Sequence, residues 1–299
     1  MTDIYVDKQY RYPREREPLI SKIVEGIILS FAIMGMFIGL QMMISVAATL
    51  GVSAAYAAKT GCDMQIAMLL SAKFMTTGSF MTGLTVAATA ISALFSVSFY
   101  WMIWGRKKTE ADRQYFKEKV LKEKPFIMIS IAAVGLYYVA ILIAELINVI
   151  SPATMESYNE LMEMSLGGSE ILALLAAVIL APVNEECIMR GLILKNLQKF
   201  FSTPVVIIIQ AVMFGIFHMN WVQGFYVLPI GAALGYVGIK SRSVFPCIYM
   251  HLFYNMMSFV SALLPKFCQT VLFSVFAAVV CAVVIWYMGK ENYGKNEFG

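Results

Sequence analysis

The sequence predicts an all-α, polytopic membrane protein, with about eight transmembrane helices and a polar site inside the helical bundle. Of its 299 residues, 60% are hydrophobic and 14% are charged, whereas a soluble domain carries about 25% charged residues. The mean hydropathy is +0.72. Apolar stretches of about 20 residues, the length of a membrane-spanning helix, recur along the chain.

Eight apolar stretches predict the helices, and they cover residues 23–49, 80–104, 126–150, 169–198, 204–221, 224–240, 244–264 and 268–289. The stretch 64–79 is shorter and contains Lys73, which predicts an interfacial or re-entrant helix. We divide the chain into N-terminal transmembrane helices with a basic loop (1–125), a core (126–289) and a tail (290–299).

The charges of the loops predict the orientation. The loop 105–125 carries eight basic residues, whereas the loop 151–170 carries four glutamates and neither Lys nor Arg. Because cytoplasmic loops are enriched in Lys and Arg, we expect both termini in the cytoplasm and a multi-pass protein of the cell membrane. We expect the loop 105–125 to form a solvated helix, and docking on anionic lipid head groups is the alternative.

Three ionisable residues stand at the end of an uncharged run, in the segment NEECIMRG (184–191). Glu186 and Arg190 have the i, i+4 spacing and order of a helical ion pair. Glu185 projects about 100° away around the helix, so it faces another partner. The alternative is a helix end at the membrane interface, where all three side chains reach toward water.

Both histidines of the chain lie in apolar segments, each with a companion four residues away. His218 follows Phe214, and Asn255 follows His251. A glutamate can take a proton from water, a histidine can orient that water, and amide or imidazole N–H groups can hold an oxyanion. The sequence therefore provides the groups for hydrolysis. It contains no G-x-S-x-G motif, and its four aspartates lie outside the apolar stretches, which excludes serine and aspartyl sites.

Straight helices do not bring these residues to one depth in the membrane. We therefore expect an irregularity: a break at Pro182, a tilt of the fifth and sixth helices, or an inward bend of the NWVQG link (220–224). Irregular backbone at membrane depth is tolerated where it lines a cavity.

The order E-E-x-x-x-R, F-x-x-x-H, H-x-x-x-N on successive membrane helices resembles the CAAX protease and bacteriocin-processing (CPBP, or Abi) family of intramembrane peptidases, which includes type II CAAX prenyl endopeptidases. The resemblance covers about residues 126–289. The matching residues are Glu185, Glu186, Arg190, Phe214, His218, His251 and Asn255. It implies that Glu186 and Arg190 form a structural pair and that Phe214 packs in the site.

The same resemblance implies the catalytic roles. Glu185 is the general base, His218 positions the water, and His251 and Asn255 stabilise the oxyanion. Glu185, His218 and His251 could alternatively form a zinc site with one open position. The sequence has no H-E-x-x-H motif and no evident carboxylate to support the ligands, because Glu145 and Glu170 lie near helix ends. We expect a metal-independent peptidase, with zinc as the alternative.

The expected substrate is a membrane-tethered or hydrophobic peptide or protein. Prenylated CAAX substrates belong to the eukaryotic members, whereas this Met-rich, short-looped chain resembles bacterial ones, for which we expect leader peptides. The alternatives are a non-catalytic bacteriocin self-immunity or scaffold protein on the same fold, and a proton-coupled transporter. The net charge of +4 says little about nucleic acid, and we expect no nucleic-acid partner. Five cysteines without a C-x-x-C pair predict no disulfide framework.

Overall fold

The computed structural model describes residues 18–290, which contain helices and no strand. The predicted all-α membrane fold is therefore confirmed in its class. The predicted tail 290–299 lies outside the described residues apart from Lys290, and so do residues 1–17, which carry most of the N-terminal basic charge. The described cysteines are all free, as expected.

Five helical runs are long and apolar enough to cross a membrane: Ile23–Thr60, Gly78–Lys107, Glu123–Ile150, Glu170–Leu197 and Val271–Lys290. They contain the helices α2 (Leu29–Thr60), α4 (Gly78–Ile103), α6 (Glu123–Ile150), α8 (Glu170–Leu174), α9 (Ala181–Glu186), α10 (Leu194–Leu197) and α15 (Val271–Lys290). The predicted count of eight spans is not confirmed. The other three stretches do form helices, but none exceeds 16 residues, which is less than the roughly 20 residues a span needs.

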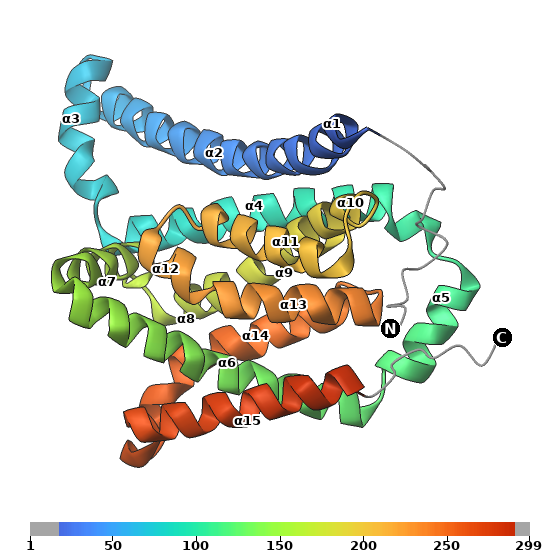
Figure 1. Cartoon of the computed structure of the whole chain (residues 1–299). Coiled ribbons are helices and arrows are strands. Elements are labelled where there is room, and N and C mark those ends of the chain that lie inside the picture. Colours follow the sequence, from blue (N-terminus) through green and yellow to red (C-terminus); the bar gives the residue numbers. More distant parts are fainter. Residues whose placement is uncertain (1–17, 291–299) are drawn as a thin grey trace.

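These shorter helices are α11 (Thr203–Phe217), α12 (Trp221–Tyr226), α13 (Leu228–Ser241) and α14 (Phe245–Val260). In Figure 1, α11, α13 and α14 occupy the middle of the bundle, between α4 on one side and α6 and α15 on the other. Buried side chains of α11, α13 and α14 form the centre of the main hydrophobic core. Helix α11 still exposes one apolar face, with Ile208, Val212 and Ile216 on it, whereas Phe214 and His251 are buried on the inner faces of these helices.

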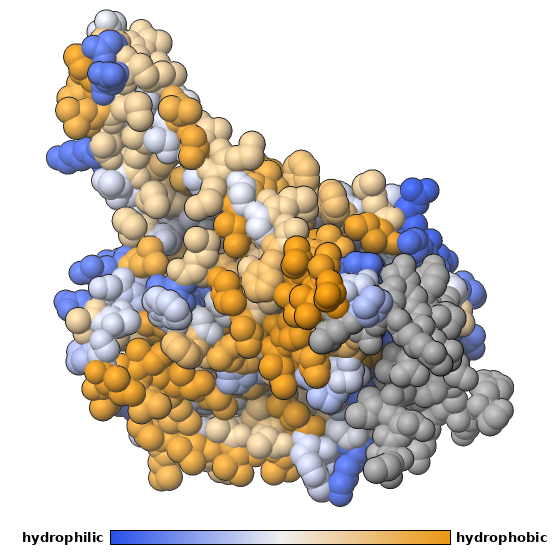
Figure 2. Space-filling model, turned by 45° about the horizontal axis from the view of Figure 1, so that its top comes forward, coloured by the Kyte–Doolittle hydropathy of each residue, from blue (hydrophilic) through white to orange (hydrophobic). Residues whose placement is uncertain are grey.

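The helix α2 and the following α3 (Met64–Met75) form an arm along one side of the bundle (Figure 1). The side chain of Asn196 holds the start of this arm, because its amide donates to the carbonyls of Glu25, at 2.9 Å, and Gly26, at 3.1 Å. Further along, the hydroxyls of Ser53 and Ser71 join α2 to α3 at 3.2 Å. Figure 2 shows that apolar residues cover much of the projecting arm, as expected of a surface in contact with lipid.

The run 170–197 stays helical at Pro182, so the expected break at this proline does not occur. The irregularity takes another form. Two π-helical segments, η4 (Leu175–Leu180) and η5 (Cys187–Ile193), flank α9 (Ala181–Glu186), while α8 (Glu170–Leu174) and α10 (Leu194–Leu197) complete the run. Pro182 directly follows η4, whose i→i+5 pattern replaces the α-helical pattern next to the proline, which has no N–H to donate. Such π-helical turns occur frequently at functional sites.

The NWVQG link supplies a second irregularity. Helix α11 ends at Phe217, Met219 adopts a left-handed φ of 51°, and α12 begins at Trp221. The turn is tight because two glycines meet: a Cβ on Gly215 would lie 2.7 Å from the carbonyl oxygen of Gly224. The two helices can therefore approach closely just beside His218.

The loop 105–125 is packed against the bundle rather than forming a free, solvated helix. It folds into η2 (Gly105–Lys107), α5 (Glu110–Tyr115) and η3 (Phe116–Val120). The Tyr115 hydroxyl donates to the carbonyl of Lys240 at 3.0 Å, and the rings of Phe116 and Phe245 lie 6.0 Å apart. Here the sequence-based expectation was incomplete, because it did not foresee these contacts with α13 and α14.

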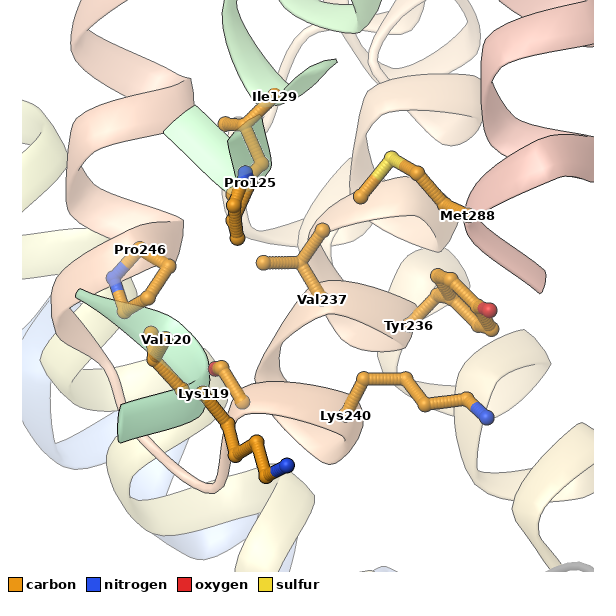
Figure 3. A pocket seen from close by; sticks show the side chains of 10 residues that line it. Lys119, Val120, Pro125, Ile129, Tyr236, Val237, Lys240, Pro246 and Met288 are labelled. Atoms are coloured by element: carbon orange, nitrogen blue, oxygen red, sulfur yellow. The ribbon is translucent and has the colours of Figure 1, made fainter. Parts of the chain in front are cut away.

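Behind η3 lies a small apolar cleft between α6, α13 and α15, with a volume of about 30 Å³ (Figure 3). Ile129, Val237 and Met288 point into it, whereas the ammonium groups of Lys119 and Lys240 point away.

The amphipathic helix α7 (Pro152–Leu166) forms most of the acidic loop 151–170. It packs against α4 and α6 at the opposite end of the bundle. After α14, the short helices η6 (Ser261–Leu263) and η7 (Lys266–Gln269) lead to α15. At the other end of the chain, α1 (Leu19–Lys22) and η1 (Ile23–Ile28) precede α2.

Candidate active site

The carboxylate of Glu185 lies between the two histidines. Its Oε2 atom is 3.9 Å from Nε2 of His218 and 3.8 Å from Nε2 of His251. The three residues come from α9, from the end of α11 and from α14. The Glu185 side chain is 14% exposed, and Oε2 has no hydrogen-bond partner among the described residues. The short central helices thus bring together groups that straight spanning helices would separate.

The backbone fixes the tautomer of His218. Its Nδ1 lies 2.7 Å from the carbonyl oxygen of Phe214, one turn earlier in α11. A carbonyl oxygen can only accept a hydrogen bond, so Nδ1 carries the proton and donates. In the neutral ring, Nε2 is therefore an acceptor, and it faces Glu185.

His251 is oriented by Glu186, a contact that the sequence analysis missed. Nδ1 of His251 lies 2.8 Å from Oε1 of Glu186, and this oxygen also accepts from the Arg190 guanidinium at 2.9 Å. Because this carboxylate oxygen already accepts from the guanidinium, it also accepts here: Nδ1 is the donor, and Nε2 of the neutral ring faces Glu185 as an acceptor. The i, i+4 spacing predicted the Glu186–Arg190 pair, and the pair is present. No spacing along the chain could predict that Glu186 also contacts His251, which lies 65 residues away.

Arg190 is held from several sides. Its side chain is 1% exposed, Glu186 is fully buried, and the second terminal nitrogen of the guanidinium donates to the carbonyl of Gly231 at 2.9 Å. The guanidinium also lies 4.7 Å from the ring centre of Phe214. These contacts balance the charge of both buried residues and fix the position of Glu186 beneath His251. The alternative of three side chains reaching toward water does not apply here.

Phe214 packs edge-on against both imidazoles, with ring centres 4.7 Å from His218 and 5.7 Å from His251. It is completely buried. Its ring therefore sets the separation of the two histidines, and its carbonyl orients one of them. The place that the resemblance implied for Phe214, packed in the site, agrees with these contacts.

Asn255 lies one turn after His251 on α14, and its amide nitrogen donates to the carbonyl of Ala177 at 2.7 Å. Ala177 belongs to the π-helical segment η4. The contact joins α14 to the run that carries Glu185. One amide hydrogen of Asn255 is used in this way, and its second hydrogen is a further donor.

The geometry bears on a metal in two ways. The expectation that no carboxylate supports a ligand was wrong for His251, because Glu186 accepts its Nδ1–H. However, among the described residues no group of three or more His, Cys, Asp or Glu side chains is arranged to hold a metal ion.

The fold and the site define a membrane protein with a carboxylate and two imidazoles enclosed by its helices. Residues 167–257 match the family described as type II CAAX prenyl endopeptidase Rce1-like. This segment contains all seven motif residues, so the resemblance is confirmed over this part of the chain. Members of this family are usually proteases, which supports protease activity at the level of the family. No curated protein and no solved structure matches the chain.

Proposed function

We propose that this protein is an intramembrane endopeptidase in which Glu185 activates water. One observation carries the proposal: Glu185 Oε2 lies 3.8–3.9 Å from Nε2 of both His251 and His218. These distances exceed a direct hydrogen bond. One water molecule between the three atoms can contact each of them at ordinary hydrogen-bond length. A water molecule has two hydrogens, so it donates one to Glu185 and one to the acceptor Nε2 of His218, and its lone pairs point outward.

The reaction follows from this placement. Glu185 takes a proton from the water while the water oxygen forms a bond to the carbonyl carbon of the peptide, giving a tetrahedral oxyanion. The C–N bond then breaks, and Glu185 returns the proton to the leaving nitrogen. The products are a new carboxyl end and a new amino end, and no other reactant is needed.

The oxyanion needs hydrogen-bond donors, and the structure limits which groups can supply them. Neutral His251 has no hydrogen on Nε2, so it donates there only when its ring carries a second proton. Glu186, 2.8 Å from Nδ1, stabilises that charged ring. The free amide hydrogen of Asn255 is the second donor in this proposal. Removing one such donor typically costs a factor of about 10² to 10³ in kcat.

The substrate we propose is a peptide or protein held in or at the membrane, because Glu185 lies inside the bundle on a membrane-spanning run. The match to the Rce1-like family favours cleavage near a C-terminus that carries a lipid. A bacterial leader peptide, of the bacteriocin-processing kind, is the alternative substrate. In both cases the cleaved bond must reach the enclosed carboxylate.

The test compares membrane peptides from cells that carry wild type or Glu185→Gln. The variant keeps the size and shape of the side chain but cannot act as a base. We expect at least one peptide to disappear in the variant and to be restored when purified wild-type protein is added to the membranes. Identical peptide sets would overturn the proposal and favour a binding or scaffold role.

A further inference from the structure

Three tyrosines from three different helices lie near the candidate active site. Tyr158 belongs to α7, Tyr226 to α12 and Tyr254 to α14, and α7 and α12 lie side by side at one end of the bundle (Figure 1). The hydroxyl oxygens of Tyr158 and Tyr226 are 2.6 Å apart. The ring centre of Tyr254 is 6.4 Å from that of His251. The proposed mechanism uses none of these three residues, which we call the tyrosine cluster.

The turn after α11 holds Tyr226 close to the catalytic groups. Gly224, two residues before Tyr226, packs on Gly215, three residues before His218, so closely that a Cβ on either glycine would meet the carbonyl oxygen of the other at 2.7–3.2 Å. Nε2 of His218 is in turn 3.9 Å from Oε2 of Glu185. Helix α12 therefore starts beside the site and carries Tyr226 along it.

The electrostatic surroundings of Tyr226 agree with this placement. Burial raises the pKa of the Tyr226 hydroxyl well above its ordinary value, and the neighbouring Tyr158 and Tyr254 add to the rise. The negative charge of Glu185 is a further, smaller cause. Helix α12 lies outside the five runs of membrane-spanning length. Because its pKa is raised, the hydroxyl keeps its proton at neutral pH and remains a hydrogen-bond donor.

The tyrosine cluster has more hydroxyl hydrogens than acceptors. Each tyrosine carries one such hydrogen. In the Tyr158–Tyr226 pair one hydrogen lies between the two oxygens, and the other has no acceptor among the described residues. The Tyr254 hydroxyl has no hydrogen-bond partner among them either, although this residue is only 6% exposed. Because buried hydroxyls are normally hydrogen-bonded, two donors are left for a ligand.

The chemistry of the tyrosine cluster selects an uncharged acceptor. The nearby carboxylate of Glu185 repels an anion, whereas the carbonyl oxygens of a peptide main chain are neutral and accept hydrogen bonds. The aromatic rings around the hydroxyls suit the apolar side chains of a membrane peptide. We propose that Tyr254 and the Tyr158–Tyr226 pair bind the main chain of the substrate and donate to two of its carbonyl oxygens beside the cleaved bond. This inference rests on the proposed peptidase function and names residues that position its substrate.

The test uses the purified full-length protein in neutral detergent and two quenched-fluorescent peptides. One peptide ends in a farnesylated C-a-a-X sequence, and the other is an alanine–leucine peptide with an N-terminal palmitoyl chain. Cleavage gives kcat and KM, and binding in the Glu185→Gln background, which lacks the base, gives Kd. Tyr254→Phe keeps the ring and breaks no hydrogen bond to a described residue. We expect it to raise KM and Kd about three- to tenfold, the effect of one lost hydrogen bond, and to change kcat less than about twofold, because such a bond is equally strong in the transition state.

A second variant and a matched control complete the design. Tyr158→Phe/Tyr226→Phe removes both hydroxyls of the pair, and we expect at least the same rise in KM and Kd. The control Tyr249→Phe lies on α14 as well and loses a 2.9 Å hydrogen bond to Ser130. We expect it to change KM and Kd less than about twofold. If the double variant does not fold, Tyr254→Phe decides alone.

The outcomes separate this inference from the proposed function. If the wild type cleaves a peptide but Tyr254→Phe binds and cleaves it equally well, the inference is overturned and the proposed function stands. If the peptides bind without being cleaved, and the cluster variants lose affinity while the control does not, the peptide-binding role stands and the proposed function falls. The inference is also overturned by a fall in kcat at unchanged KM, which would place the hydroxyls at the oxyanion, by an equal loss in the control, or by the absence of binding of both peptides.

Discussion

The two adjacent glutamates offer the sharpest comparison, because one isosteric substitution at each position should affect different properties. In Glu186→Gln the buried guanidinium of Arg190, 1% exposed, loses the one carboxylate that it pairs with among the described residues. Removing one member of a buried ion pair costs about 3–5 kcal/mol. Glutamine can still accept one hydrogen bond, so we expect the lower end, about 3 kcal/mol. For Glu185→Gln, whose Oε2 has no partner, we expect about 1 kcal/mol or less.

The assay is unfolding in mixed micelles with increasing dodecyl sulfate, followed by the fluorescence of the four tryptophans. The free energy of unfolding should fall by at least 2 kcal/mol more for Glu186→Gln than for Glu185→Gln. Relative to the stability that each variant keeps, Glu185→Gln should lose more peptidase activity than Glu186→Gln. Glu185→Gln should lose a factor of about 10² to 10⁴ while remaining folded.

A double variant provides the control. Glu186→Leu combined with Arg190→Met removes both charges, and replacing a buried pair by apolar side chains of similar volume is often neutral for stability. It should therefore be more stable than Arg190→Met alone. Equal stability of Glu185→Gln and Glu186→Gln would refute the division of roles, because it would mean that Glu186 and Arg190 do not depend on each other.

The remaining predictions concern the surroundings of the site. Gly215→Ala places a Cβ 2.7 Å from the Gly224 oxygen, so the free energy of unfolding should fall by about 1–3 kcal/mol in unfolding titrations. The control Gly83→Ala, with open space around it, should leave stability unchanged or raise it. Asn255→Ala should lower kcat by about 10² to 10³ with little change in KM; a change in KM alone would contradict an oxyanion role. Exhaustive chelation should leave activity unchanged, and a loss that Zn²⁺ restores would contradict the metal-free mechanism.

The sequence was sufficient for the helical class and for the pairing of Glu186 with Arg190, because both depend on local spacing. It could not show how α11, α13 and α14 pack between the longer helices. Apolar stretches of about 20 residues look alike whether they face lipid or protein, so the count of eight spans was not confirmed. The meeting of the histidines with Glu185 depends on the turn at Met219 and on π-helical turns, and neither has a strong signature in the residues themselves.

The contact of Glu186 with His251 escaped the sequence analysis for a different reason. One oxygen accepts from two donors, and the helical spacing to Arg190 already gave Glu186 a sufficient partner. Adjacent glutamates are equivalent in a sequence, so nothing marked one of them as the support of a distant imidazole. The packing of the loop 105–125 was likewise hidden, because Tyr115 and Phe116 have no pattern that distinguishes a buried ring from an exposed one.

The carbonyl oxygen of Gly231 accepts from Arg190 at 2.9 Å and from the Gln210 amide at 2.7 Å. One backbone atom of α13 thereby joins η5 and α11, and Gly235 leaves the space that the Gln210 side chain needs. These three elements cannot separate without exposing a charged donor to an apolar interior, so they behave as a single rigid block. Any movement that admits a substrate to Glu185 must therefore come from helices outside this block, such as the arm of α2 and α3, which the amide of Asn196 joins to the bundle near its start.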